Sequence, residues 1–297
     1  MFLLLARDIS SGGMTVLLMH ESTSKQDVGA SPSALGCVLT LAYREWVRFF
    51  RQRNRVIGAL GQPILFWLLF GTGMHGAFQT GSQDYMTFYL PGTMALILLF
   101  TAIFATISII EDRKEGFLQG VLVAPVPRWT IAAGKILGGS AIAWVQSLLF
   151  LSLALAVGSV PMSTGVLAAI LILGIASFSL TALGVFFAWP MESTQGFHAI
   201  MNLVLMPLWL LSGAFFPIPE WAADAAIGQQ IMHWAMRLNP MTYVIAGLRD
   251  ALFGSSAAGE FWEPSVAISW AVSLVFLALT SVLAWWIVQR PAKGDLR

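Results

Sequence analysis

Six long apolar runs divide the chain, and polar or turn-rich stretches separate them. A helix rises by roughly 1.5 Å per residue, so a run of about 20 residues crosses a hydrocarbon core of about 30 Å. Each run reaches that length. The expected spans lie near residues 56–75, 86–110, 131–158, 164–188, 197–216 and 264–288. The pattern predicts an all-α membrane protein with six transmembrane helices, whose transmembrane domain covers residues 38–290.

The stretch before the first span predicts an N-terminal amphipathic interfacial helix with its apolar side in lipid. One face carries Tyr43, Trp46, Val47 and Phe50, and another carries Arg44, Arg48, Arg51 and Arg55. A solvated basic helix is the open alternative. Residues 1–37 are mixed and rich in serine, and we expect a mobile cytosolic extension there; residues 291–297 are expected to form a cytosolic tail.

The stretch before the last span is long for a loop and still apolar. Pro219 begins one helical pattern that runs through Leu238. Asn239 and Pro240 then provide an N-cap and a first-turn proline for a second helix, which Gly254 closes. At about 14 residues, or roughly 21 Å, the second helix is too short to cross a membrane. We expect a pair of short re-entrant external helices; an amphipathic surface loop is the alternative.

Dense charge occurs between the second and third runs, in residues 109–135. The acidic and basic residues 111–115 precede Gly116, and apolar residues then follow at helical spacing until Pro125. This pattern predicts a short amphipathic helix parallel to the membrane surface.

Composition supports the membrane class, because 57% of residues are hydrophobic and only 10% are charged, against about 25% charged in soluble domains. A net charge of +1 gives no attraction to nucleic acid, so no nucleic-acid partner is expected. Fourteen of the 16 basic residues fall on one side if both termini are cytosolic, and only Arg237 and Arg249 fall outside. The positive-inside rule therefore predicts cytosolic termini in a multi-pass membrane protein.

A search for catalytic chemistry finds no candidate, and neither a catalytic nor a metal site is predicted. The four histidines are scattered, and the single cysteine excludes an internal disulfide. Gly134–Lys135 resembles a phosphate-binding loop only superficially, since Trp129 and Ile136 occupy positions where that loop needs glycine and Ser or Thr. Gly134 and Gly138 instead favour close helix packing. The spans hold almost no ionisable groups, so energy for transport would have to come from a partner.

Several motifs together resemble the ABC-2 type permease family of ATP-binding-cassette transporters, over about residues 40–290. They are residues 111–116, Pro125–Arg128, Gly134–Gly139, Leu211–Pro217, Asn239–Tyr243 and Leu248–Arg249. The resemblance implies that two permease copies, expected as a homodimer, work with two copies of a separate ATPase subunit in the cytoplasmic (inner) membrane. ATP and magnesium would bind to that ATPase, and this chain would bind no cofactor itself; its other partner would be membrane lipid.

The resemblance also implies roles for named residues. The coupling helix that contacts the ATPase would involve Glu111, Arg113, Glu115, Gly116, Phe117, Leu118 and Leu122, with ion pairs from the charged residues and groove contacts from the apolar ones. A second, smaller contact would be the loop 191–196. A substrate path along the second and fifth spans would involve Thr93, Phe100, Phe104, Asn202 and Met206. An external gate would involve Phe216, Pro217, Asn239, Pro240, Tyr243 and Arg249.

The expected function is export of an amphipathic, drug-like or lipid-like substrate. Export of a polysaccharide or glycolipid by the same family is an alternative. An ATPase-independent channel, scaffold or integral membrane enzyme is a further alternative, but it would not need the charged loop at 111–116.

Overall fold

The structure is a computed structural model, and it describes residues 33–74, 85–123, 125–219, 221–222, 224–254 and 262–290. The predicted N-terminal extension, except for its last residues, and the predicted tail lie outside the described residues. The described elements are all helices: α1 (Ala34–Arg51), α2 (Arg53–Gly73), α3 (Tyr85–Lys114), α4 (Phe117–Leu122), α5 (Trp129–Ala156), α6 (Gly165–Ala188), α7 (Thr194–Trp209), the π-helical turn η1 (Leu210–Ala214), α8 (Ile227–Arg237), α9 (Pro240–Phe253) and α10 (Val266–Val288).

Six of the described helices are long and apolar enough to cross a membrane, which confirms the predicted number of spans. They are α2, α3, α5, α6, α7 with η1, and α10. Their bounds agree with the predicted runs to within a few residues. The main difference is α3, which continues to Lys114, about one turn beyond the predicted end.

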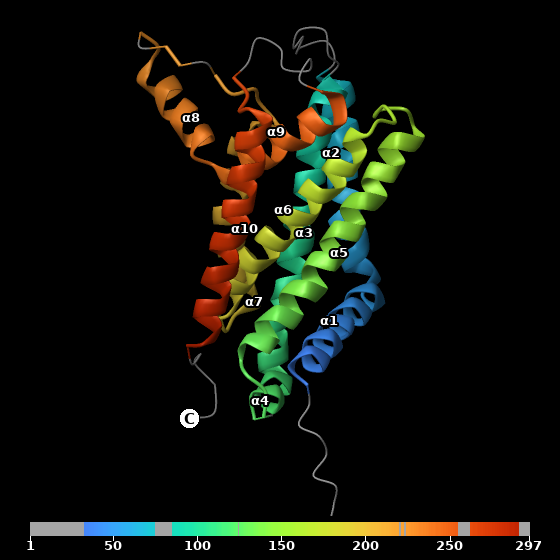
Figure 1. Cartoon of the computed structure of the whole chain (residues 1–297), viewed down its shortest axis with the longest axis vertical. Coiled ribbons are helices and arrows are strands. Elements are labelled where there is room, and N and C mark those ends of the chain that lie inside the picture. Colours follow the sequence, from blue (N-terminus) through green and yellow to red (C-terminus); the bar gives the residue numbers. More distant parts are fainter. Residues whose placement is uncertain are drawn as a thin grey trace, which may run out of the picture. The chain divides into compact units, whose positions relative to one another are not determined.

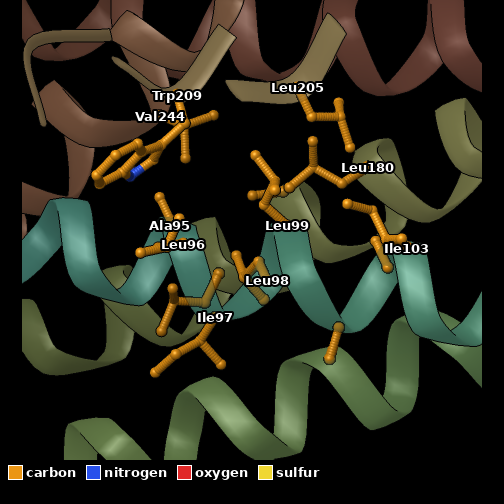
Figure 2. Close-up of a cluster of buried hydrophobic side chains, with 14 of the residues drawn as sticks. Ala95, Leu96, Ile97, Leu98, Leu99, Ile103, Leu180, Leu205, Trp209 and Val244 are labelled. Carbon is orange, nitrogen blue, oxygen red and sulfur yellow. The ribbon is translucent and has the colours of Figure 1, made fainter. Parts of the chain in front are cut away.

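The central helix is α3, which packs against α2, α5 and α6 (Figure 1). Almost all of its side chains are buried, because this run is apolar on every face. Figure 2 shows the core around it, where Ala95 and Leu99 lie on the side of Val244 of α9, Leu205 of α7 and Leu180 of α6, while Ile97 and Leu98 point to the opposite side of α3. By contrast α2 and α10 bury only narrow stripes. These two helices therefore present large apolar faces to the surroundings.

Close packing of α1 on α5 depends on two glycines. A Cβ on Gly134 would lie 2.6 Å from the Leu41 Cβ, and one on Gly138 would lie 2.9 Å from the Ala42 carbonyl oxygen. Real Cβ contacts are longer than this, so both positions require glycine for the helices to approach. The predicted packing role of these glycines is confirmed.

The helices α8 and α9 lie at the end of the bundle opposite α4 (Figure 1). The predicted start and end of α9 are confirmed: the Asn239 side chain accepts a hydrogen bond from the Met241 N–H at 2.9 Å, and the helix ends at Gly254 with φ of 77°. The predicted start of α8 at Pro219 is wrong, since the helix begins at Ile227. The preceding segment instead folds back, with the Trp221 ring 5.8 Å from that of Trp234.

Candidate functional site

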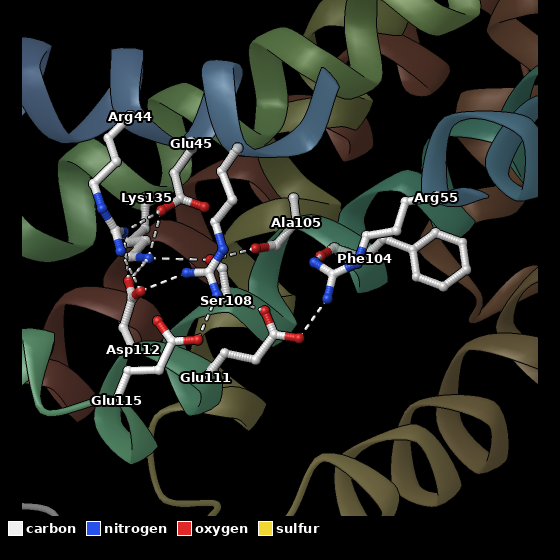
Figure 3. A network of polar contacts seen from close by, with 11 residues as sticks. Arg44, Glu45, Arg55, Phe104, Ala105, Ser108, Glu111, Asp112, Glu115 and Lys135 are labelled. Carbon is white, nitrogen blue, oxygen red and sulfur yellow. Dashed lines mark hydrogen bonds and ion pairs between the residues drawn. The ribbon is translucent and has the colours of Figure 1, made fainter. Parts of the chain in front are cut away.

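A cluster of charged side chains lies where α1, α2, α3 and α5 meet, at the end of the bundle that carries α4 (Figure 3). We call it the charge cluster. It consists of four basic and four acidic residues: Arg44, Arg48, Arg55, Lys135, Glu45, Glu111, Asp112 and Glu115.

Asp112 and Lys135 form the buried centre of the charge cluster. The Asp112 side chain is 0% exposed and that of Lys135 is 3% exposed, and the two form an ion pair. The Lys135 ammonium also donates to Glu45 Oε1 at 2.6 Å and to Ser108 Oγ at 3.0 Å. Buried charges are tolerated when they are paired and hydrogen-bonded in this way. The centre therefore joins α1, α3 and α5 through one ammonium group.

Two arginines of α1 approach Asp112 from the other side. Arg44 donates two hydrogen bonds to its carboxylate, at 2.9 and 2.7 Å, in the paired geometry that suits guanidinium and carboxylate groups. Arg48 donates to Asp112 and, at 2.9 Å, to Glu111. Burial lowers the pKa of Arg44, but the hydrogen bond and charge of Asp112 outweigh burial and raise that pKa above its ordinary value. Arg44 therefore stays charged.

The first turn of α2 joins the same cluster through Arg55. Its guanidinium pairs with Glu111 and also reaches the Phe104 carbonyl oxygen at 3.5 Å. Together with Arg48, this contact holds Glu111 from two helices. The end of α3 is thereby attached to α1, α2 and α5.

Residues 111–114 of the charged segment expected in a loop are in fact the last turn of α3, and Glu115 follows that turn. Compensation by the basic side chains of α1 and α5 allows the helix to continue to Lys114, and Gly116, with a φ of 78°, then forms the turn into α4. The short predicted helix is therefore present over Phe117–Leu122. Its position follows directly from α3, which the charge cluster holds in place.

Some apolar side chains of α4 already pack against other parts of this chain. Leu118 is only 1% exposed, so it packs in the core and is not free to contact a partner in this structure. The Arg44 guanidinium carbon lies over the Phe117 ring, 3.7 Å from the ring centroid. Leu122 is half-buried. Glu115 is mostly exposed and reaches Arg48 at 3.4 Å. Gly116 and Gly120 are exposed.

An apolar groove of about 720 Å³ runs between the first turns of α1 and α4. We call it the α1–α4 groove. Its lining consists of Ser33, Gly36, Cys37, Thr40, Leu41, Phe117, Gly120, Val121 and Val126. A Cβ built on Gly120 would meet no atom within 4 Å, so the groove is open on this side.

Arg113 extends the attachment to the opposite side of α3. It donates to the carbonyl oxygens of Trp189 at 2.7 Å and Met191 at 2.8 Å, at the end of α6. These carbonyls begin the loop 191–196, the second predicted contact. The two predicted contact segments are therefore joined through one guanidinium.

Sequence reasoning missed the centre of the charge cluster. Lys135 stands alone in an apolar run, Glu45 lies 90 residues away among the arginines of α1, and only the folded chain brings the two together. One signal was available: a lone charged residue in an otherwise apolar helical face requires a partner of opposite sign. That signal does not say which partner.

The residues predicted to line a substrate path are not all brought together. The rings of Phe100 and Phe104 stack on one side of α3 with their centroids 6.5 Å apart. The Phe104 ring also lies near His198 of α7, with 6.3 Å between the ring centroids. Thr93 is fully buried and bonds to the Tyr89 carbonyl oxygen, so it lines no open surface here.

The two α7 residues of that path lie differently. Asn202 is exposed on the outside of the single chain. The reason is that α7 turns Phe197, Met201 and Leu205 toward the core and the opposite side outward. Met206 is half-buried.

Four of the six residues predicted for an external gate are joined to helix ends by polar contacts or caps. Asn239 caps α9 and donates to the Leu208 carbonyl oxygen at 2.6 Å, and Pro240 is the first residue of α9. Tyr243 donates to the Arg237 carbonyl oxygen at 2.8 Å. Arg249 pairs with Glu263 and reaches the Gly213 carbonyl oxygen at 3.1 Å. The remaining two, Phe216 and Pro217, follow η1; Phe216 is exposed and Pro217 is half-buried.

Among the described residues, no group of three or more His, Cys, Asp or Glu side chains could hold a metal ion. The charge cluster joins helices, and it contains no nucleophile beside a general base. The arrangement at the α4 end therefore fits a mechanical attachment.

Comparison with known proteins places this arrangement in context. The sequence pattern of the ABC-2 type transporter family matches residues 37–253. The daunorubicin resistance ABC transporter permease protein DrrB1 of Streptomyces coeruleorubidus is 26% identical over 256 residues, covering 83% of this chain and 84% of the relative. The inner membrane transport permease YadH of Escherichia coli K12 is 26% identical over 242 residues, covering 76% and 84%. The putative transport permease ycf38 of Cyanophora paradoxa is 22% identical over 268 residues, covering 86% and 89%.

Proposed function

Because the chain belongs to the ABC-2 type transporter family, we propose that it is the membrane-spanning permease of an ATP-driven exporter and that a separate ATPase subunit docks on α4. ATP and magnesium would bind to that subunit. The cargo would be an amphipathic, drug-like or lipid-like molecule, in keeping with the drug-resistance permease among the relatives.

The observation that carries the proposal is the way α4 is attached. It follows α3 after only Glu115 and Gly116, and the last turn of α3 is held by ion pairs from α1, α2 and α5. A force applied to α4 would therefore reach four helices at once. The α1–α4 groove beside it gives a partner's apolar side chain a place to insert.

The placement of the shorter helices in the membrane belongs to the same proposal. We infer that α1 lies along the cytosolic surface, since Tyr43 is 70% and Leu39 is 53% exposed although both are apolar or aromatic. The helices α8 and α9 would dip into the outer leaflet. Both termini would then be cytosolic, in accord with the distribution of Lys and Arg.

Transport would use the seam between two permease copies, expected as a homodimer. Its support is the outward side of α7 and of the first residue of η1, where Leu203 is 75% and Leu210 is 41% exposed and Asn202, next to Leu203, is also exposed. Phe100 and Phe104 lie near α7 through His198. Partly buried aromatic rings of this kind suit an amphipathic cargo.

The test introduces a bulky side chain at Gly120. Gly120→Trp should fold normally, because nothing lies within 4 Å of its Cβ, but should block the ATPase from α4. The matched control is Gly73→Trp, at an equally open position on α2 far along the chain from α4. Phe117→Asp is a poorer test, since the new carboxylate could pair with Arg44.

Each variant would be co-expressed with the partner ATPase subunit. Co-purification of the two chains and ATP hydrolysis by the complex would be measured in nanodiscs. We expect Gly120→Trp to weaken the affinity for the ATPase at least about tenfold, because blocking one contact at the centre of an interface reduces the binding free energy by roughly 2 kcal/mol or more. Equal assembly of both variants and wild type would exclude α4 as the docking site.

A further inference from the structure

The junction between α1 and α2 is a break in the helix with an unusual concentration of arginine. α1 ends at Arg51, α2 begins at Arg53, and Gln52 between them is non-helical with φ of −97° and ψ of 78°. A hollow of about 540 Å³ opens here, and it is lined by Arg51, Gln52, Arg53, Asn54 and Arg55.

Two of these arginines are not used by the charge cluster. Arg55 turns inward to Glu111, whereas Arg51 and Arg53 are exposed. In the described part of the chain, no carboxylate lies within ion-pair distance of either. The basic and acidic residues of the charge cluster balance each other, four against four. Arg51 and Arg53 are therefore two uncompensated positive charges beside the hollow.

An exposed apolar stripe continues from this hollow along α2. Ile57 is 68% exposed, Leu65 is 53% exposed and Leu68 is 44% exposed, and they follow one another at helical spacing with Gly61 between the first two. A Cβ on Gly61 would meet only the Ile57 side chain, at 3.9 Å, so the stripe is a shallow track at this point. From Ile57 to Leu68 the track extends for about 16 Å.

We propose that this junction binds an anionic phospholipid. Its headgroup phosphate would lie between Arg51 and Arg53, and one acyl chain would follow the track over Gly61. Guanidinium groups bind phosphate with paired hydrogen bonds, and basic residues next to a span attract anionic headgroups. The first residue of a spanning helix is at the depth where such headgroups lie.

The position of the junction favours lipid over the ATPase as its occupant. The α1–α4 groove involves the start of α1, from Ser33 to Leu41, whereas the junction is at the other end of that helix. The stretch of α1 from Leu41 to Arg51 separates the two by about 15 Å. A bound lipid would then hold the elbow between α1 and α2, next to the Arg55 contact with Glu111.

The first experiment removes the two charges. The full-length chain in detergent micelles would be titrated with dioleoyl phosphatidylglycerol, and bound lipid would be counted by native mass spectrometry. Arg51→Gln with Arg53→Gln should weaken binding about 30-fold, from the usual contribution of two basic residues. The control, Lys114→Gln with Arg290→Gln, removes the same charge from two other exposed positions and should change binding by less than about threefold. Equal losses in both pairs would mean non-specific attraction and would overturn the proposal.

The second experiment fills the acyl track without changing charge. Gly61→Phe should weaken phosphatidylglycerol binding about fourfold, the equivalent of one buried methylene group, whereas Gly73→Phe at the other end of α2 should not. If roughly 10 mM inorganic phosphate displaced the lipid, only the headgroup would contribute to binding, and the proposed acyl track would be wrong. If the variant with Arg51→Gln and Arg53→Gln instead retains the lipid but no longer binds the ATPase, the junction is a protein contact and the proposal is wrong.

Discussion

The two ends of the bundle hold their helices together by different means. At the α4 end, eight charged side chains of the charge cluster connect α1, α2, α3 and α5, and the central ones are buried. At the α8 end, the described residues contain one ion pair, Arg249–Glu263, and the other polar contacts go mainly to backbone carbonyl groups. Aromatic rings of Trp221, His233 and Trp234 complete that end.

The difference bears on what each end can do. Separating buried charges is unfavourable, because a buried ion left without its partner destabilises the fold by roughly several kcal/mol. The α4 end is therefore suited to move as one piece. Contacts at the α8 end are individually weak, and α8 leaves Ile227 78% and Leu238 77% exposed. We expect that end to adjust more easily to its surroundings.

The largest effect should come from Asp112. Asp112→Ala leaves Lys135 and two arginines of α1 without their shared carboxylate, so unfolding should become easier by about 3–5 kcal/mol. The full chain would be unfolded by titrating SDS into mixed micelles and followed by tryptophan fluorescence. Glu115→Gln is the control, and because Glu115 is 61% exposed it should cost less than about 1 kcal/mol.

A double variant sharpens this prediction. Asp112→Leu combined with Lys135→Met removes the central ion pair and should recover part of the loss, because apolar pairs of similar size replace buried ion pairs well, whereas Glu45 keeps, among the described residues, only its contact with Arg44 at 3.4 Å. If Asp112→Ala cost no more than Glu115→Gln, the charge cluster would not be the attachment that we describe.

An intermediate effect should come from Arg249. This side chain pairs with Glu263, donates to the Gly213 carbonyl oxygen and lies 4.4 Å from the Phe88 ring centroid, so it joins α9 to η1 and α3. Arg249→Ala should lower the free energy of local unfolding around α9 by about 2–3 kcal/mol. Hydrogen exchange should accelerate in residues 210–219 and 240–254 and stay unchanged in α4.

The comparison variant at this end is Arg237→Ala. Arg237 stacks over Trp262 at 4.5 Å, and such partly exposed contacts contribute only about 0.5–1 kcal/mol. A global loss of stability with Arg249→Ala, equal at both ends of the bundle, would remove the distinction between them.

A smaller effect than that of Arg249→Ala should come from Asn239, which has two separable roles. Asn239→Ala loses both the cap on Met241 and the hydrogen bond to Leu208, and should cost about 2 kcal/mol in the opening of α9. Asn239→Asp keeps an acceptor for the cap but has no amide donor for the Leu208 carbonyl. Amide exchange over residues 241–252 should therefore rise clearly for the first variant and only slightly for the second; equal rates for both would mean that the cap contributes nothing.

The sequence by itself determined the helical class, the six spans and the capped helix α9. These features depend on local properties: the length of an apolar run, and the cap that Asn239, Pro240 and Gly254 provide. The start of α8 was predicted wrongly because Trp221 packs back on α8, a contact between neighbours that helical periodicity does not reveal.

Only the tertiary structure decided which charges meet and which predicted contact residues stay free. Lys135 finds Glu45 90 residues away, because Gly134 and Gly138 let α1 and α5 approach closely. Packing of the other helices buries Leu118 of α4 and leaves Asn202 of α7 exposed. Hydrophobicity states that an apolar side chain will avoid water, but the partner it finds depends on how distant helices cross, which no local pattern contains.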